Sequence, residues 1–158
     1  MPAPSLTSYL QESTKRTQRL LANDLKALAT EKHTACPGGE ARTPVNIVAE
    51  CAAVNGFIAE YLTTGKAERP PREQREAFLS TFDTAEKALA YLEEQTQRLV
   101  DALGNLDVNT LGDMVEGPMG LVPKLALAQL PAMHMMYHDG QLNYIQTLYG
   151  DKEMHWGG

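Results

Sequence analysis

The chain has 158 residues, 43% of them hydrophobic, and a formal net charge of −6, which fits one domain, residues 1–158, with its own hydrophobic core. The negative charge, without a dense Lys/Arg cluster, argues against a surface that follows phosphates, so we expect no nucleic-acid partner. No apolar run approaches the roughly 20 residues that cross a bilayer, and the cysteines are too few for a disulfide framework, so we expect a reduced, cytoplasmic protein with no membrane partner.

The first half of the chain predicts two helices. Leucines recur at helical intervals over residues 5–30, and the Pro-Gly-Gly segment 37–39 then ends the pattern. Thr43 and Pro44 start a second helix, because threonine suits the N-cap and proline at the first helical position loses no needed donor. This helix ends near Gly65 and is apolar on nearly all sides, which is typical of a helix buried within a bundle.

Helical spacing continues in the second half. Residues 72–103 predict a third helix, with large apolar residues at helical intervals and charges between them. Glycines then interrupt residues 104–120, which predicts a long loop or a pair of short turns. A fourth helix is predicted over residues 122–149, and Pro131 inside it marks either a kink or the true start of the helix. We therefore predict an all-α fold, an antiparallel four-helix bundle.

Two histidines in the last predicted helix are the most specific chemical feature. His134 and His138 lie four residues apart, so both imidazoles leave one helix face and can bind one ion. Such pairs also arise by chance in helices, in which case one histidine is a core residue and the other is exposed. The pattern lacks the glutamate of HExxH, so it does not indicate a zincin-type protease.

Glu50 is the candidate for a third ligand, because helical stepping places it in an apolar stripe of the second helix. A buried carboxylate needs a partner, which is either an ion shared with His134 and His138, an arginine such as Arg42, or a tyrosine bound to the neutral acid. Two imidazoles and one carboxylate leave coordination positions open for water or substrate, and suit Zn, Ni, Fe(II) or Mn without distinguishing among them. Cys51, next to Glu50, is expected to pack as a small hydrophobe, although its thiolate could approach an ion.

The segment His134-MMY-His138-DGQL resembles the last-helix motif of the DinB/YfiT-like superfamily of metal-binding four-helix bundles. The following YIQTLYGD resembles the end of that helix, and NIVAE with Glu50 falls where the family usually places its first histidine. The resemblance covers essentially the whole chain in helix order and loop lengths. It implies a divalent ion held by Glu50, His134 and His138, with Glu50 in place of the usual histidine.

Members of that superfamily include S-transferases that use mycothiol or bacillithiol and a thiol-dependent maleylpyruvate isomerase. The resemblance therefore implies an ion that binds a low-molecular-weight thiol and presents its thiolate to an electrophilic small-molecule substrate. Tyr137, Gln141 and Asn55 would neighbour the ligands, and the protein would form a homodimer. The replacement at Glu50 equally fits a non-catalytic bundle that has lost the ion and acts as a binding or dimerisation module.

Overall fold

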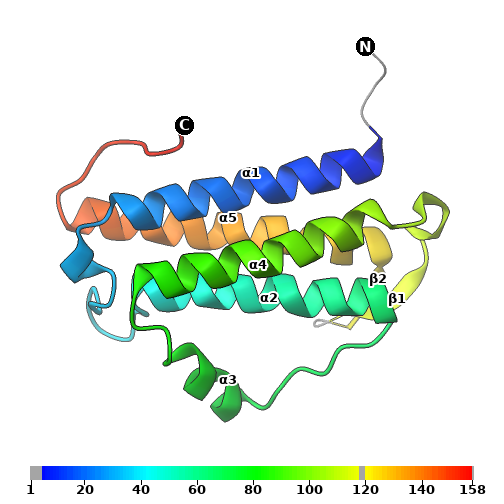
Figure 1. The fold of residues 1–158 in the computed structure, drawn as a ribbon, viewed down its shortest axis with the longest axis horizontal. Helices are drawn as coiled ribbons and strands as arrows, with labels where there is room; N and C mark the ends of the chain where they lie inside the picture. The colour runs from blue at the N-terminus through cyan, green and yellow to red at the C-terminus, as the bar shows by residue number, and fades with distance from the viewer. Residues whose placement is uncertain (1–4, 118–119, 158) are drawn as a thin grey trace.

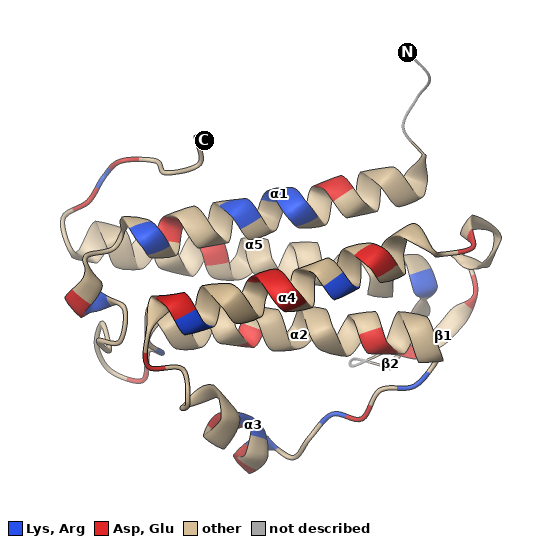
Figure 2. Ribbon diagram, viewed as in Figure 1, with Lys and Arg blue, Asp and Glu red and all other residues tan. Residues whose placement is uncertain are grey.

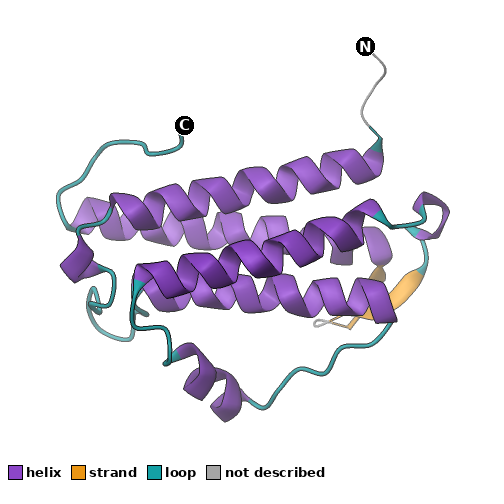
Figure 3. Cartoon of the chain, in the orientation of Figure 1, coloured by secondary structure: helices purple, strands orange, loops and turns teal. Residues whose placement is uncertain are grey.

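The structure is a computed structural model that describes residues 5–117 and 120–157 (Figure 1). Its helices are α1 (Leu6–Ala27), α2 (Pro44–Thr64), α3 (Arg72–Leu79), α4 (Ala85–Gly104) and α5 (Lys124–Leu148). Two short 3-10 helices (Thr30–Lys32 and Val108–Thr110) and two strands, β1 (Met114–Gly117) and β2 (Gly120–Pro123), lie between them (Figure 3). The all-α class predicted from the sequence is confirmed.

Helices α1, α2, α4 and α5 form the bundle. Both α1 and α2 pack against α4 and α5, so α1 and α2 lie across the bundle from each other. α2 and α4 run in one direction, while α1 and α5 run in the opposite direction (Figure 1). The antiparallel arrangement thus holds between these two pairs. Within the pair α2 and α4 the helices are parallel, because the connection that contains α3 returns along the length of the bundle before α4 begins.

α2 forms the centre of the core. As predicted, the hydroxyl of Thr43 caps α2 by accepting a hydrogen bond from the backbone N–H of Asn46 at 3.3 Å, and Pro44 occupies the first turn of the helix. Gly65 ends the helix with a left-handed φ of 74°. By length and composition α2 could cross a membrane, but 56% of its most apolar window is buried inside the protein, as in the core helix of a bundle.

The predicted third helix, residues 72–103, is two helices. The hydroxyls of Ser80 and Thr81 each donate to a backbone carbonyl of the preceding turn at 2.7 Å. The hydroxyl of Thr84 then caps α4 by accepting a hydrogen bond from the Lys87 amide at 3.2 Å. Hydroxyl side chains that bind nearby backbone groups compete with the continuing helix, so the prediction of one helix from apolar spacing alone was wrong here.

Part of the segment 104–120, predicted as loop or turns, belongs to an antiparallel hairpin. The register pairs Met114 with Pro123, Val115 with Val122, Glu116 with Leu121 and Gly117 with Gly120. Val115 and Val122 pack together against the apolar core at that end of the bundle. Gly120 has a φ of 104°, a conformation that favours glycine. The hairpin takes up residue 122, so α5 begins at Lys124 rather than at the predicted position.

α5 is one helix on both sides of Pro131, which is buried in the bundle. The prediction that the helix begins at Pro131 is therefore wrong. The helix ends at Leu148, and Gly150 follows with a φ of 90°. His134 and His138 thus lie in the middle of a long helix that packs against α1 and α2.

Candidate metal centre

The two histidines of α5 face each other across one helical turn. The Nε2 atoms of His134 and His138 lie 3.2 Å apart, and the ring centroids lie 4.5 Å apart with the rings edge to face. The side chain of His138 is 3% exposed, and His134 is half-buried. Helical spacing therefore places both imidazoles on one inward face, as the sequence predicted.

Glu50 reaches the same point from α2. Its Oε2 atom lies 3.5 Å from Nε2 of His138. The carboxylate also forms an ion pair with Arg42, the alternative partner considered from the sequence. Its side chain is 28% exposed, more than its place in an apolar stripe had suggested. The structure therefore places Glu50 beside His138, with Arg42 as the positively charged partner of the carboxylate.

Both imidazoles are neutral at pH 7. Burial lowers the pKa of His134 to about 4, with further contributions from His138 and Arg42. Burial likewise lowers the pKa of His138, with a smaller lowering from Arg42 and an opposing effect from its hydrogen bond to Gln141. In that bond Nδ1 of His138 donates to Oε1 of Gln141 at 2.7 Å, so Nε2 carries the lone pair. Neutral imidazoles with free lone pairs are the form that binds metal ions.

The arrangement fits a divalent ion. Two nitrogens bound to one ion at about 2.0–2.1 Å, at a tetrahedral angle, lie about 3.3–3.4 Å apart. The Nε2 atoms of His134 and His138 are 3.2 Å apart, where Nε2–H of His134 donates to Nε2 of His138, and an ion that takes the place of this proton meets both nitrogens at a suitable distance. Among residues 5–117 and 120–157, Nδ1 of His134 is buried without a hydrogen-bond partner, which is uncommon for a purely structural histidine.

Cys51 was expected from the sequence to pack as a small hydrophobe whose thiolate could approach an ion. It is fully buried in the apolar core, as expected. Its Sγ and one ring nitrogen each of His134 and His138 also lie within 4.8 Å of one another. Burial strongly raises the pKa of the thiol, so without an ion it stays protonated. α2 thus offers this centre two adjacent donors of different chemistry.

The three predicted neighbours differ in their roles. Gln141 binds His138, as expected for a residue that orients a ligand. Tyr137 packs its ring edge to face against His138, with centroids 5.0 Å apart, and is 66% exposed. Asn55 does not reach the centre: its amide donates to Oγ1 of Thr96 at 2.9 Å and to Sδ of Met135 at 3.4 Å. Asn55 therefore ties α2 to α4 and α5.

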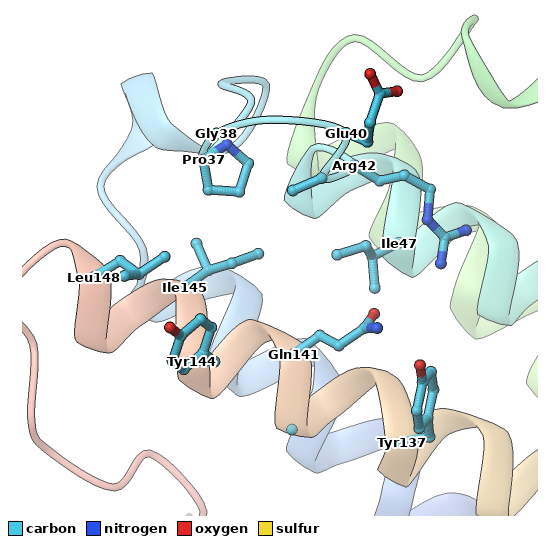
Figure 4. Close-up of a pocket in the computed structure, with 12 residues that line it drawn as sticks. Pro37, Gly38, Glu40, Arg42, Ile47, Tyr137, Gln141, Tyr144, Ile145 and Leu148 are labelled. Atoms are coloured by element: carbon cyan, nitrogen blue, oxygen red, sulfur yellow. The ribbon is translucent and has the colours of Figure 1, made fainter.

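A pocket of about 560 Å³ lies beside the centre, between the loop of residues 37–42 and α5 (Figure 4). Much of its wall is apolar: Ile47 of α2 faces Ile145 and Leu148 of α5. Gln141 and Arg42 also line it. Because Gln141 binds His138 and Arg42 binds Glu50, the pocket adjoins the centre through these two side chains.

A buried polar network on the far side of His138 was missed from the sequence. Asp24 of α1 and Asp139 of α5 are both fully buried. Oδ2 of Asp24 accepts hydrogen bonds from Nδ2 of Asn143 at 2.7 Å and from Nε1 of Trp156 at 3.2 Å, and Nε2 of Gln146 donates to the Asp24 carbonyl at 2.8 Å. Burial, the hydrogen bond to Asp24 and its charge raise the pKa of Asp139 to about 8. The carboxyl group of Asp139 therefore keeps its proton at pH 7.

This network and the histidines predict a stability maximum for the metal-free protein near pH 6.5. Below about pH 6.5 the unfolded state protonates His134 and His138, whereas their lowered pKa values favour the neutral imidazoles in the folded state. Stability therefore falls as the pH falls, because these two groups outweigh the opposing effect of Asp139. Between about pH 6.5 and 8 the largest effect comes from Asp139. Its folded pKa is raised, so the folded state keeps a proton that the unfolded state has released. Stability is then lost as the pH rises toward about 8, by up to about 1.4 kcal/mol per pH unit.

Urea unfolding at about pH 5, 6.5 and 8 measures this profile. Asp139→Asn resembles the protonated carboxyl, so the variant should keep most of the stability at pH 6.5 and lose the decline above it. Parallel declines of the wild type and the variant between pH 6.5 and 8 would show that Asp139 does not hold the proton.

Comparison with known proteins agrees with this architecture. A sequence profile of the DinB superfamily matches residues 11–142. No curated protein matches the chain significantly. A conserved protein from Enterococcus faecalis superposes with a TM-score of 0.75 at 13% identity, over 92% of this chain and 98% of that one.

Two further solved structures are similar. The colibactin self-resistance protein ClbS, solved in complex with double-stranded DNA, gives a TM-score of 0.70 at 17% identity over 92% of this chain and 98% of its own. The mycothiol-dependent maleylpyruvate isomerase gives 0.69 at 15% identity, over 90% of this chain and 61% of the isomerase. At these identities the similarity establishes a shared fold.

Proposed function

The chain belongs to the DinB superfamily, as the motif around its paired histidines indicated, and from this premise we propose that it is a metal-dependent enzyme that transfers a low-molecular-weight thiol to an electrophilic small molecule. The observation that supports this most strongly is the convergence of three donors. His134 Nε2 lies 3.2 Å and Glu50 Oε2 lies 3.5 Å from Nε2 of His138, and both imidazoles are neutral. Donors this close suit one divalent ion, of which Zn, Ni, Fe(II) and Mn are candidates.

In this proposal His134, His138 and Glu50 hold the ion, and two further side chains orient them. Gln141 fixes His138 in the tautomer whose Nε2 is free to bind. Arg42 holds the carboxylate of Glu50 in place and offsets part of its charge. The ligands are thus ordered before an ion arrives, which reduces the entropy lost on binding.

When bound, the ion lowers the pKa of a coordinated thiol and favours its thiolate. The apolar wall formed by Ile47, Ile145 and Leu148 suits the apolar part of an electrophile in the adjoining pocket. The thiolate sulfur attacks the electrophilic carbon, a carbon–sulfur bond forms, and the leaving group departs with its electron pair. The thiol proton passes to solvent. Arg42, at the edge of the pocket, is placed to orient a negatively charged group of either reactant.

Filling the pocket should reduce transfer about tenfold or more while leaving the metal content unchanged. Gly140 lies on the pocket wall, and a Cβ built there meets no atom within 4 Å. Gly140→Trp therefore places a ring in the pocket without displacing the helix. Gly140→Ala is the matched control: it should keep activity and stabilise the helix by up to about 1 kcal/mol.

Zinc-loaded protein is mixed with mycothiol or bacillithiol and a chlorodinitrobenzene. The absorbance of the thioether product, which forms as chloride leaves, is then measured over time. The proposal expects a thiol-dependent rate that a chelator abolishes and that Gly140→Trp reduces. An unchanged rate in Gly140→Trp would show that the electrophile does not bind in this pocket. No rate above background with either thiol, in protein that holds its ion, would contradict the transfer itself.

A second candidate is a non-catalytic bundle that binds a partner or a second copy. The ion pair between Arg42 and Glu50 favours it, because the pair satisfies the carboxylate without an ion. Large apolar side chains exposed on α5, Met133, Tyr137, Tyr144 and Leu148, offer a surface to a second copy. The homodimer remains a prediction that sedimentation would test. A dimer that carries no ion would favour this second function.

The expected absence of a nucleic-acid partner also remains a prediction. The net charge is −6, and acidic and basic residues are interspersed along α1 and α4 (Figure 2). ClbS, with the same fold, was nevertheless solved in complex with double-stranded DNA. The fold alone therefore does not decide the question, and the cytoplasmic location likewise stays a prediction.

A further inference from the structure

Two adjacent residues of α2 face the paired histidines with different chemistry. Glu50 is 28% exposed and pairs with Arg42, on the side of the centre nearer to solvent. Cys51 is fully buried, on the side toward the core. The ligand atoms of Cys51, His134 and His138 lie within 4.8 Å of one another. The centre therefore has a carboxylate at its outer edge and a thiol at its inner edge.

We propose that Sγ of Cys51 is a ligand of the ion held by His134 and His138, and that it makes the centre selective for ions that favour sulfur, Zn²⁺ over Mn²⁺. This deepens the proposed function and rests on it for the presence of an ion. With Cys51 bound, a tetrahedral ion keeps a position for the substrate thiol when Glu50 stays paired with Arg42. Zn²⁺ binds thiolate and imidazole together, whereas Mn²⁺ favours carboxylate and water oxygens. Cysteine ligation would thus narrow a choice among metals that the sequence left open.

Distances support the proposal. A sulfur about 2.3 Å and a nitrogen about 2.05 Å from one ion, at a tetrahedral angle, lie about 3.6 Å apart. The present separations of up to 4.8 Å exceed this by about an ångström, a gap that rotation of the Cys51 side chain can close. The two helices that carry these donors, α2 and α5, already pack against each other.

Charge supports it independently. Both histidines bind as neutral ligands, and Arg42 offsets part of the charge of Glu50. A buried divalent ion with only these partners keeps most of its charge uncompensated, at a high cost in a core of low polarity. A thiolate at Cys51 supplies the missing negative charge from the buried side. On binding, the thiol loses its proton to solvent and its sulfur donates an electron pair to the ion.

Cobalt(II) substitution tests the proposal directly, because a thiolate ligand gives a sulfur-to-cobalt charge-transfer absorption that nitrogen and oxygen ligands do not. Metal-free protein is titrated with Co²⁺ alone. We expect the charge-transfer absorption to saturate at about one equivalent in the wild type and to be absent in Cys51→Ala, which still shows weaker cobalt absorption from the remaining ligands. Cys36→Ser is the matched control, since Cys36 is exposed on a loop and should not affect the spectrum.

Competition titrations add a second readout. Cys51→Ala should weaken Zn²⁺ binding about 100-fold or more, beyond what loss of an orienting partner costs, and should weaken Mn²⁺ binding much less. Cys51→Ser, which keeps the size of the side chain, repeats the test if the alanine variant does not fold.

Each other outcome overturns the proposal in a distinguishable way. Co²⁺ bound at one equivalent without charge-transfer absorption, or with the same absorption in Cys51→Ala, would show that Cys51 only packs in the core, while the ion site of the proposed function stands. Loss of the charge-transfer absorption in Cys36→Ser would show that Cys36, not Cys51, supplies the sulfur ligand. No Co²⁺ binding at all would remove both this proposal and the metal dependence of the proposed function.

Discussion

Replacing His138 by alanine should lower the affinity of the protein for Zn²⁺ by about 100-fold or more. His138 is the donor at the middle of the group: its Nε2 lies 3.2 Å from that of His134 and 3.5 Å from Oε2 of Glu50. The change also releases Gln141, which orients the ring. Loss of an orienting partner alone costs about 10–100-fold in affinity, and loss of the ligand itself should cost more. Competition against a zinc-binding dye measures the change.

His155→Ala is the matched control for this experiment. His155 pairs with Asp151 beyond the end of α5, with Nε2 2.7 Å from Oδ2, and takes no part in the centre. It should leave the affinity unchanged. Because His138 is buried, the variant's fold must be checked by circular dichroism before its affinity is read. A folded His138→Ala protein that binds Zn²⁺ as tightly as the wild type would show that the ion binds elsewhere.

Replacing Asp24 by alanine should cost about 3–5 kcal/mol of folding stability. The Asp24 carboxylate is fully buried between α1 and α5 and accepts hydrogen bonds from Asn143 and Trp156. Its loss leaves these donors, and the protonated carboxyl of Asp139, without a buried acceptor. Each such unsatisfied group costs about 1–3 kcal/mol, and the removed side chain also leaves a small cavity. Urea unfolding of the metal-free protein near pH 6.5 measures the difference.

Asp83→Ala serves as the comparison. Asp83 pairs with Lys87 on the surface, with a side chain that is 66% exposed, and such a pair contributes at most about 1 kcal/mol. A loss near 3–5 kcal/mol for Asp24→Ala, with little change for Asp83→Ala, is expected. Equal small effects at both positions would show that the buried network does not hold α1 against α5.

Local signals predicted the helices that carry the site. Apolar spacing located α1, α2 and α5, and Thr43 and Pro44 marked the start of α2. The same spacing failed where side chains bind the backbone, since the hydroxyls around Thr84 end one helix and cap the next. The β1–β2 hairpin was missed because its strands are four residues each and rich in glycine, a length at which alternation carries little information.

The candidate site was likewise predicted only in part from the sequence. The four-residue spacing of His134 and His138 predicted their convergence, because it depends on one helix alone. The depth of Cys51 in the core and the ion pair of Glu50 with Arg42 depend on how helices and loops pack, which spacing does not determine. Asp24 did leave a signal: like Glu50, it is an acid within the apolar pattern of its helix. Its partner Asp139 is far away in the sequence, so the pair could not be recognised.

The metal content of the native protein tests the central claim most directly. Elemental analysis is applied to protein purified without chelator and without a histidine tag, and again after Zn²⁺, Ni²⁺, Mn²⁺ and Fe²⁺ are offered. A centre formed by His134, His138 and a donor of α2 predicts about one divalent ion per chain, which His138→Ala loses. Protein that holds no ion under any of these conditions would contradict the account and leave a bundle in which Arg42 alone satisfies Glu50.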